Sequence, residues 1–246
     1  MSKIEAFRNG LKAFFHRLWN GKGDKKPWVR RVFLVIFALF GPLPILYLLV
    51  FRFVPVPFTP QMAIDFVTGE EVHYSWRSID AMAPGLKNSV IGSEDQNFCT
   101  HWGFDVDDIR EALKERARGK RHRGASTISQ QVARTLFLPP SRTWVRKGVE
   151  AWLTLLVEFT WPKKRILEAY LNLVDFGHGN YGAEAASQAY FRKSASALSA
   201  AQAARLASIL PNPDKWRATK AGKRRLTRAY ARTEEAVEAG MDWCVR

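Results

Sequence analysis

The sequence predicts a mainly α-helical domain that follows one N-terminal transmembrane helix. Two observations carry this prediction: residues 32–51 form an uncharged apolar run, and helical spacing of apolar residues dominates beyond residue 78. The chain has 246 residues, of which 47% are hydrophobic and 25% charged, and this composition excludes global disorder. Its two cysteines are too few for a disulfide scaffold, and their spacing excludes a cysteine-built metal site.

The apolar run at residues 32–51 is long enough to cross a bilayer. At ~1.5 Å per residue it reaches roughly 30 Å, which is the thickness of the hydrocarbon core. The alternative is a buried core helix, but few soluble helices are apolar on every side. Pro42 and Pro44 should kink the span. No cleavage site of a signal peptide follows, so we expect a retained anchor.

Charge predicts how the chain is oriented. The formal net charge is +15, and residues 1–31 hold nine basic against two acidic side chains. The positive-inside rule therefore places residues 1–31 in the cytoplasm and residues 53–246 on the far side of the membrane. The tail also carries apolar residues at helical steps between residues 4 and 18, so it either lies on the anionic inner leaflet or is a solvated basic tail.

Four segments follow from these patterns. Residues 1–31 are the basic tail, 32–51 the transmembrane helix, 52–76 a linker, and 77–246 the working domain. Within the linker, residues 64–76 alternate around a Thr-Gly pair and are compatible with a short hairpin.

Within the working domain, helix signals are local and clear. A helical stripe follows Pro162, and a capping box at Ser199 and Gln202 begins a later helix. Residues 114–123 hold six basic side chains and are either a mobile loop or a solvated charge run.

Two adjacent carboxylates begin the first polar cluster, at residues 94–103. Glu94 and Asp95 follow Val90 and Ile91 and precede aromatic residues. Desolvation and a like-charged neighbour both raise a carboxyl pKa above its free value of ~4.3, which suits a general base. The alternative is a pair of capping groups at a helix end.

The second cluster, at residues 124–131, combines hydroxyls and carboxamides at a predicted helix start. Ser126 or Thr127 can cap this helix, and Gln130 and Gln131 lie in its first turn. Backbone amides at such an end bind phosphate or sugar oxygens. The alternative is an ordinary capped helix start.

The third cluster, at residues 146–150, places an acid in apolar surroundings. Glu150 precedes a run that is apolar on nearly every side, so its carboxylate needs a partner or a function. Arg146, one helical turn earlier, is the simplest structural partner. Together, two acids and several cations behind a membrane anchor favour glycosyl transfer from a lipid diphosphate.

Five motifs occur in an order that resembles the family 51 glycosyltransferases, and most closely the monofunctional biosynthetic peptidoglycan transglycosylases of Gram-negative bacteria. They are EDQNFCTHWG at 94–103, GASTISQQ at 124–131, RKGVE at 146–150, KKRILEAYLN at 163–172 and GAEAASQAYFRK at 182–193. The resemblance implies a lysozyme-like helical glycosyltransferase domain. Its expected reaction is inverting polymerisation of lipid II into β-1,4-linked glycan strands, with release of undecaprenyl diphosphate.

The resemblance also implies a role for each matching residue. Glu94 would be the general base and Glu150 the second acid, near the donor diphosphate. The substrate-binding residues would be Ser126, Thr127, Gln130, Gln131, Arg134, Arg146 and Lys147. The residues that hold the Glu94 loop in shape would be Asp95, Phe98 and His101.

Cofactor, partners and location follow from the same resemblance. We expect no dedicated metal ligands, although a divalent cation, Mg²⁺ or Mn²⁺, is compatible with the donor diphosphate. The expected partners are lipid II, the growing glycan chain, the lipid bilayer and other cell-wall synthesis or division proteins. The expected location is the bacterial inner membrane, with a single pass, a cytoplasmic N-terminus and a periplasmic catalytic domain.

We expect no penicillin-binding transpeptidase domain, because only 34 residues follow Asn212 and no Ser-x-x-Lys occurs. The main alternative function is a membrane-tethered, lysozyme-like glycan hydrolase, which also uses two carboxylates. A nucleic-acid binder or basic scaffold would explain the charge but not the acids. Whether Cys99 and Cys244 pair is left open by the sequence.

Overall fold

The computed structural model describes residues 27–119, 124–140, 143–220 and 222–246. The chain divides into two compact units, Met1–Tyr47 and Leu48–Arg246. Most of the predicted basic tail, residues 1–26, lies outside the described residues, and so do residues 120–123 of the predicted charged loop.

The apolar run forms one long helix in two parts, α2 (Pro27–Phe40) and α3 (Pro42–Phe51). The stretch Trp28–Phe51 is 24 residues long, and by length and composition it can cross a membrane. Only 11% of its most apolar window is buried, which argues against a core helix. The two parts meet at a turn at Gly41, next to the predicted proline kink.

The unit Leu48–Arg246 is built almost entirely of helices, which confirms the predicted fold class. Its α-helices are α4 (Pro60–Thr68), α5 (Pro84–Glu94), α6 (Val106–Ala117), α7 (Ile128–Phe137), α8 (Trp144–Thr160), α9 (Lys163–Leu173), α10 (Gly182–Phe191), α11 (Ala200–Ala207) and α12 (Lys223–Glu238). The short 3-10 turns are Ile79–Ala81, Ala195–Ala197, Ala218–Lys220 and Trp243–Val245.

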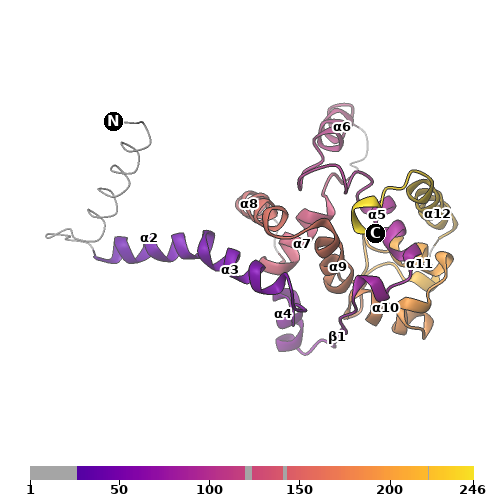
Figure 1. Ribbon diagram of the computed structural model, residues 1–246, viewed down its shortest axis with the longest axis horizontal. Helices are drawn as coiled ribbons and strands as arrows, with labels where there is room; N and C mark the ends of the chain where they lie inside the picture. The colour runs from indigo at the N-terminus through magenta and orange to yellow at the C-terminus, as the bar shows by residue number, and fades with distance from the viewer. Residues whose placement is uncertain (1–26, 120–123, 141–142, 221) are drawn as a thin grey trace. The chain divides into compact units, whose positions relative to one another are not determined.

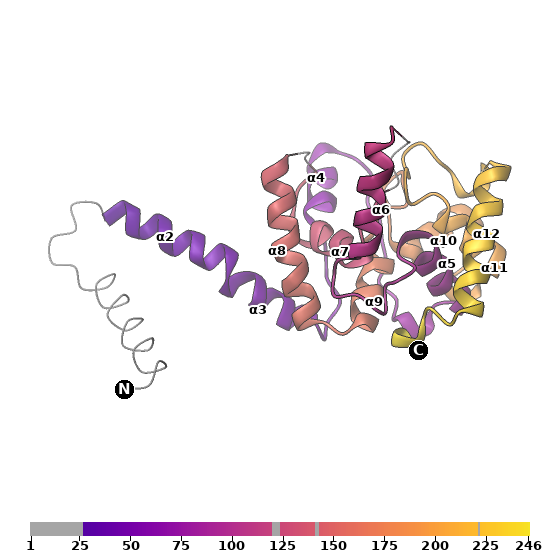
Figure 2. The ribbon, with the colours of Figure 1, turned by 90° about the horizontal axis from the view of Figure 1, so that it is seen from above.

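Two groups of helices surround the core of this unit (Figures 1 and 2). In one group α5 packs against α11 and α12, and in the other α7 packs against α8 and α9. Gly92 permits the first packing, because a Cβ there would lie 2.3 Å from the backbone oxygen of Arg232 on α12. The C-terminal end of α5 is therefore in backbone contact with α12.

The hairpin expected over residues 64–76 is wrong. Thr59 caps α4, with its side chain accepting from the amide of Met62, and Pro60 is its first residue. Gly69 ends the helix at φ 84°, so the Thr-Gly pair is a helix stop rather than a hairpin turn. The following strand β1 (His73–Tyr74) pairs in parallel with β2 (Asn180–Tyr181), far along the chain.

Residues 52–76, predicted as a linker, pack within the same unit as the rest of the domain. The Arg165 guanidinium on α9 donates to the carbonyl of Phe51 at 2.7 Å and to that of Val54 at 2.5 Å. The Tyr181 hydroxyl donates to the carboxylate of Asp65 on α4. This unit therefore begins at Leu48, well before the predicted boundary at residue 77.

The charged segment predicted as a loop begins inside a helix. Asp105 caps α6 by accepting from the amides of Asp107 and Asp108. Acidic residues occupy the first turn and Lys114 and Arg116 the last, an arrangement that the helix dipole favours. Residues 114–117 are therefore helical.

A disulfide joins the first polar cluster to the end of the chain. Cys99 and Cys244 are bonded with their Cα atoms 5.5 Å apart, across a sequence separation of 145. Such a crosslink restricts the unfolded chain strongly, because the loop that it closes is long.

We expect Cys99→Ser to lower the free energy of unfolding by about 2–5 kcal/mol. The measurement is denaturant unfolding of the detergent-solubilised chain under oxidising conditions. Cys244→Ser should cost as much, and the double variant no more than either single one. A loss below about 0.5 kcal/mol, the usual range of surface substitutions, would contradict the prediction.

Candidate active site

Glu94 is the last residue of α5 and lies half-buried against α7. Its Oε2 accepts a hydrogen bond from Nε2 of Gln131 at 3.0 Å. Burial raises the pKa of Glu94 above its ordinary value, although the Gln131 bond and the charges of Arg232 and Arg134 oppose this rise. A carboxylate with a raised pKa is a stronger base than a solvated one.

Gln131 is itself held in place by a buried phenol. The hydroxyl of Tyr170 on α9 donates to Oε1 of Gln131 at 3.2 Å, which leaves the amide nitrogen to donate to Glu94. Burial raises the pKa of Tyr170 well above its usual value, so the phenol stays protonated. Tyr170 belongs to the helical stripe that follows Pro162, and no local sequence signal marks it as a site residue.

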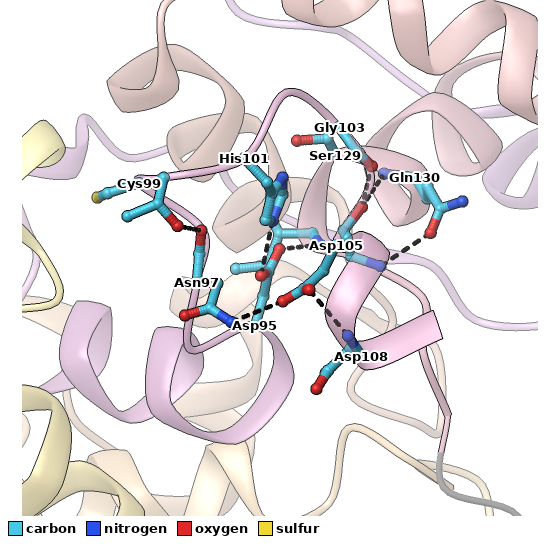
Figure 3. Close-up of polar contacts among 12 residues, drawn as sticks. Asp95, Asn97, Cys99, His101, Gly103, Asp105, Asp108, Ser129 and Gln130 are labelled. Atoms are coloured by element: carbon cyan, nitrogen blue, oxygen red, sulfur yellow. Dashed lines mark hydrogen bonds and ion pairs between the residues drawn. The ribbon is translucent and has the colours of Figure 1, made fainter. Parts of the chain in front are cut away.

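The loop after Glu94 is fixed by Asp95 (Figure 3). Its carboxylate accepts from Nε2 of His101 at 2.8 Å and from the backbone amide of Ile128, at the start of α7, at 2.9 Å. Phe98 is fully buried and meets the His101 ring edge-on, with the ring centroids 6.4 Å apart. Asp95, Phe98 and His101 therefore all lie within the packing of this loop.

A second carboxylate, missed by sequence reasoning, supports the same loop. Asp105 accepts from Nδ2 of Asn97 at 2.8 Å while it caps α6 (Figure 3). Burial alone would raise the pKa of Asp105, but hydrogen bonds from Asp108 and Asn97 and the charge of His101 hold it below its ordinary value. The N-cap pattern at the start of α6 was the signal that could have found it.

In the second cluster, Thr127 and Gln130 make structural contacts, whereas Gln131 contacts Glu94. Thr127 caps α7 in a capping box with Gln130, and its hydroxyl donates to the carbonyl of Gly103 at 2.6 Å. Thr127 and Gln130 are thus buried and occupied by backbone contacts. Ser126 lies half-buried just before the helix, and Gln131 contacts Glu94.

Glu150 is 2% exposed within α8 and is flanked by two cations. Its Oε1 accepts from Nζ of Lys147, and its Oε2 lies 3.5 Å from Nη1 of Arg146. The side chain of Lys147 is 46% exposed, so this ammonium reaches both the buried carboxylate and solvent. The buried Arg146 atoms Nε and Nη1 and the Oε2 of Glu150 make no hydrogen bond within the described residues.

Arg134 lies in a pocket of about 310 Å³ that also contains Gln131. Glu94, Gln131 and Arg134 therefore form one group around α7. Arg146, Lys147 and Glu150 form a second group on α8, which packs against α7. Among the described contacts, no hydrogen bond or ion pair joins the two groups directly.

One further contact links α7 to the C-terminal end of α8. The hydroxyl of Ser129 donates to Oε1 of Glu158 at 2.5 Å, and Nζ of Lys163 pairs with the same oxygen at 2.7 Å. Glu158 was not predicted as a site residue. No sequence pattern marks it, because its partners come from two other helices.

The residues around Glu150 do not fit a resident metal ion. Within the described ranges, no group of three or more His, Cys, Asp or Glu side chains is placed to hold one. Glu150 is a single carboxylate whose charge is already balanced by Lys147 and Arg146. Mg²⁺ and Mn²⁺ require oxygen-rich ligand sets, which this single paired carboxylate does not supply.

We expect Asp95→Ala to lower the free energy of unfolding by about 3 kcal/mol, because it leaves His101 and the Ile128 amide without their acceptor. Asp95→Asn should cost less, because it keeps the shape and one acceptor oxygen. Urea unfolding of the full chain measures both. Asp107→Asn is the matched control, since that carboxylate is exposed. An equal, small effect of Asp95→Ala and Asp107→Asn would contradict this role.

Comparisons with known proteins identify the family of this chain. A family model described as transglycosylase matches residues 61–238. A protein of Caulobacter vibrioides is 46% identical over 195 residues, covering 79% of this chain and 85% of its own length. A protein of Bdellovibrio bacteriovorus is 49% identical over 70% of this chain and 71% of its own length. A protein of Haemophilus influenzae is 46% identical over 80% of this chain and 81% of its own length. All three are named biosynthetic peptidoglycan transglycosylase. The chain belongs to the transglycosylase family.

Proposed function

We propose that this chain is a monofunctional peptidoglycan glycosyltransferase of bacterial cell-wall biosynthesis, and that it polymerises lipid II into β-1,4-linked glycan strands. The observation that carries the proposal is the half-buried Glu94, whose raised pKa suits a general base and which lies in the same group as Arg134. The names of the relatives support the same activity class.

In the proposed reaction Glu94 acts on the acceptor. Its carboxylate takes the proton from the 4-hydroxyl of N-acetylglucosamine, and that oxygen attacks C1 of the N-acetylmuramic acid of the donor. The bond from C1 to the diphosphate oxygen breaks as the new glycosidic bond forms. Attack opposite to the leaving group converts an α-linked diphosphate into a β-glycoside, so the enzyme inverts the configuration at C1.

The cations would stabilise the leaving undecaprenyl diphosphate. Arg134, Arg146 and Lys147 supply guanidinium and ammonium groups, which bind phosphate oxygens strongly. Glu150 holds Lys147 and Arg146 from within α8, so its proposed role is to orient these cations. Ser126 and Gln131 would add neutral donors to the sugar or phosphate oxygens.

We propose that the chain is anchored in the inner membrane with its catalytic domain in the periplasm. The basic residues before the apolar helix support a cytoplasmic N-terminus. The disulfide between Cys99 and Cys244 supports an oxidising compartment for the domain. The growing glycan chain and the bilayer would then be its immediate partners, and cell-wall synthesis or division proteins are the further partners we propose.

We expect Glu94→Gln to reduce polymerisation of labelled lipid II by roughly 10² to 10⁴, because the amide cannot accept the proton. The measurement is the amount and length of glycan formed by the purified full chain. Glu234→Gln is the matched control, since that side chain is exposed on α12.

Two outcomes would contradict this assignment. Unchanged turnover in Glu94→Gln would remove Glu94 from the mechanism, and cleavage of preformed glycan without polymer would favour a hydrolase. A pH profile adds a separate readout. Wild-type activity should fall as the pH is lowered through the raised pKa of Glu94, because the base becomes protonated, and the residual activity of the variant should not follow this limb.

We expect Lys147→Ala to raise the KM for lipid II or lower turnover by roughly tenfold or more, since one charged hydrogen bond to the diphosphate is lost. Steady-state kinetics over a range of lipid II concentrations measure the effect. Lys215→Ala, which removes an exposed ammonium elsewhere, should behave as wild type. Normal donor kinetics in Lys147→Ala would refute its role.

A further inference from the structure

A pocket of about 380 Å³ opens beside Glu94, and its other walls have no role in the proposed reaction. Helix α12 contributes three of its lining side chains, Arg225, Arg228 and Arg232. Three guanidinium groups and the single carboxylate of Glu94 line this small volume, so the pocket favours a negatively charged ligand. We call it the α12 pocket.

Two buried polar atoms of the α12 pocket lack partners. Nη1 of Arg225 and Oγ of Ser93 are buried, and neither makes a hydrogen bond within the described residues. The Arg225 guanidinium carbon lies 4.0 Å from the centroid of the Trp216 ring, and this stacking fixes its plane. Buried donors without acceptors are unfavourable, so these two atoms point to an absent acceptor.

The pocket is also held open by rigid elements. Its apolar lining comprises the ring of Trp216 and three small or stiff residues, Ala207, Ala229 and Pro211, which leave space for a ligand. Nη1 of Arg232 donates to the carbonyl of Ser93 at 2.8 Å, at the point where α5 and α12 are in backbone contact. The cationic wall and the Glu94 end of α5 are therefore fixed relative to each other.

We propose that the α12 pocket is a second anion subsite, which binds a carboxylate or phosphate oxyanion of the saccharide substrate next to Glu94. The proposal rests on the proposed function. Guanidinium groups match the planar oxygens of carboxylates and the oxygens of phosphates. A lipid-linked muramyl peptide carries such groups in two places, its peptide carboxylates and its diphosphate.

Binding in this pocket would also act on the base. The charge of Arg232 lowers the pKa of Glu94, against the effect of burial. An oxyanion paired with Arg232 would weaken this stabilisation of the ionised carboxylate. Occupancy would therefore raise the pKa of Glu94 and make it a stronger base at the time when substrate is present.

The first test measures binding without catalysis. Calorimetry on the detergent-solubilised full chain compares a soluble muramyl peptide with free carboxylates, the same peptide with amidated carboxylates, and inorganic diphosphate. We expect Arg225→Gln to weaken at least one oxyanion probe roughly tenfold or more, while the amidated peptide is unaffected. Whether the muramyl peptide or the diphosphate loses affinity identifies the source of the oxyanion.

The second test separates binding from chemistry with lipid II as substrate. Arg225→Gln should raise the KM roughly tenfold and change kcat much less, and Arg225→Lys should recover part of the loss. Arg228→Gln, at the exposed side of the same pocket, gives a second variant that does not disturb the core. Arg224→Gln is the matched control, because this neighbouring arginine is exposed and does not line the pocket.

The proposal is overturned if Arg225→Gln and Arg228→Gln both fold, as judged by thermal unfolding, and leave probe affinities and KM unchanged. It is also overturned if the free peptide loses affinity and the amidated peptide loses as much. Failure of the proposed function is distinguishable, because the wild-type chain would then make no glycan, whereas the calorimetry would still decide whether the pocket binds oxyanions.

Discussion

The arrangement of the residues around Glu94 depends on the buried carboxylate of Asp95. It directly follows Glu94, and it binds His101 within its own loop and the Ile128 amide on α7. A buried carboxylate is stable only when its oxygens are paired, so these two contacts hold the loop in a single conformation. Gln131 lies one helical turn after Ile128, and its contact with Glu94 follows from the same junction.

Opposing influences set the strength of the base. Burial disfavours the charged form of Glu94, whereas Gln131, Arg232 and Arg134 favour it. These three residues come from α7 and α12, which lie in different helix groups around the core. The packing of α5 against α12 therefore matters chemically as well as structurally, because Gly92 brings the Arg232 backbone against the helix that ends at Glu94.

Local signals made much of this structure predictable from the sequence. These signals include the apolar span, the cap at the start of α7, the capping box at the start of α11 and the pairing of Glu150 with Arg146. Each depends on residues close to one another in the sequence. The Thr-Gly pair at residues 68–69 misled, because the same dipeptide can end a helix or turn a hairpin, and the decisive signal was the Thr59 cap.

Contacts between distant segments could not be read in this way. The pairing of β1 with β2 joins residues more than a hundred positions apart, and Tyr170 reaches Gln131 from another helix. No sequence motif marks the arginines of α12 as site residues, because only the fold places them beside Glu94.

The bond between Cys99 and Cys244 closes the chain into a covalent macrocycle. Helices α6 to α12 all lie within it, so a single backbone cut in any of them would release no fragment.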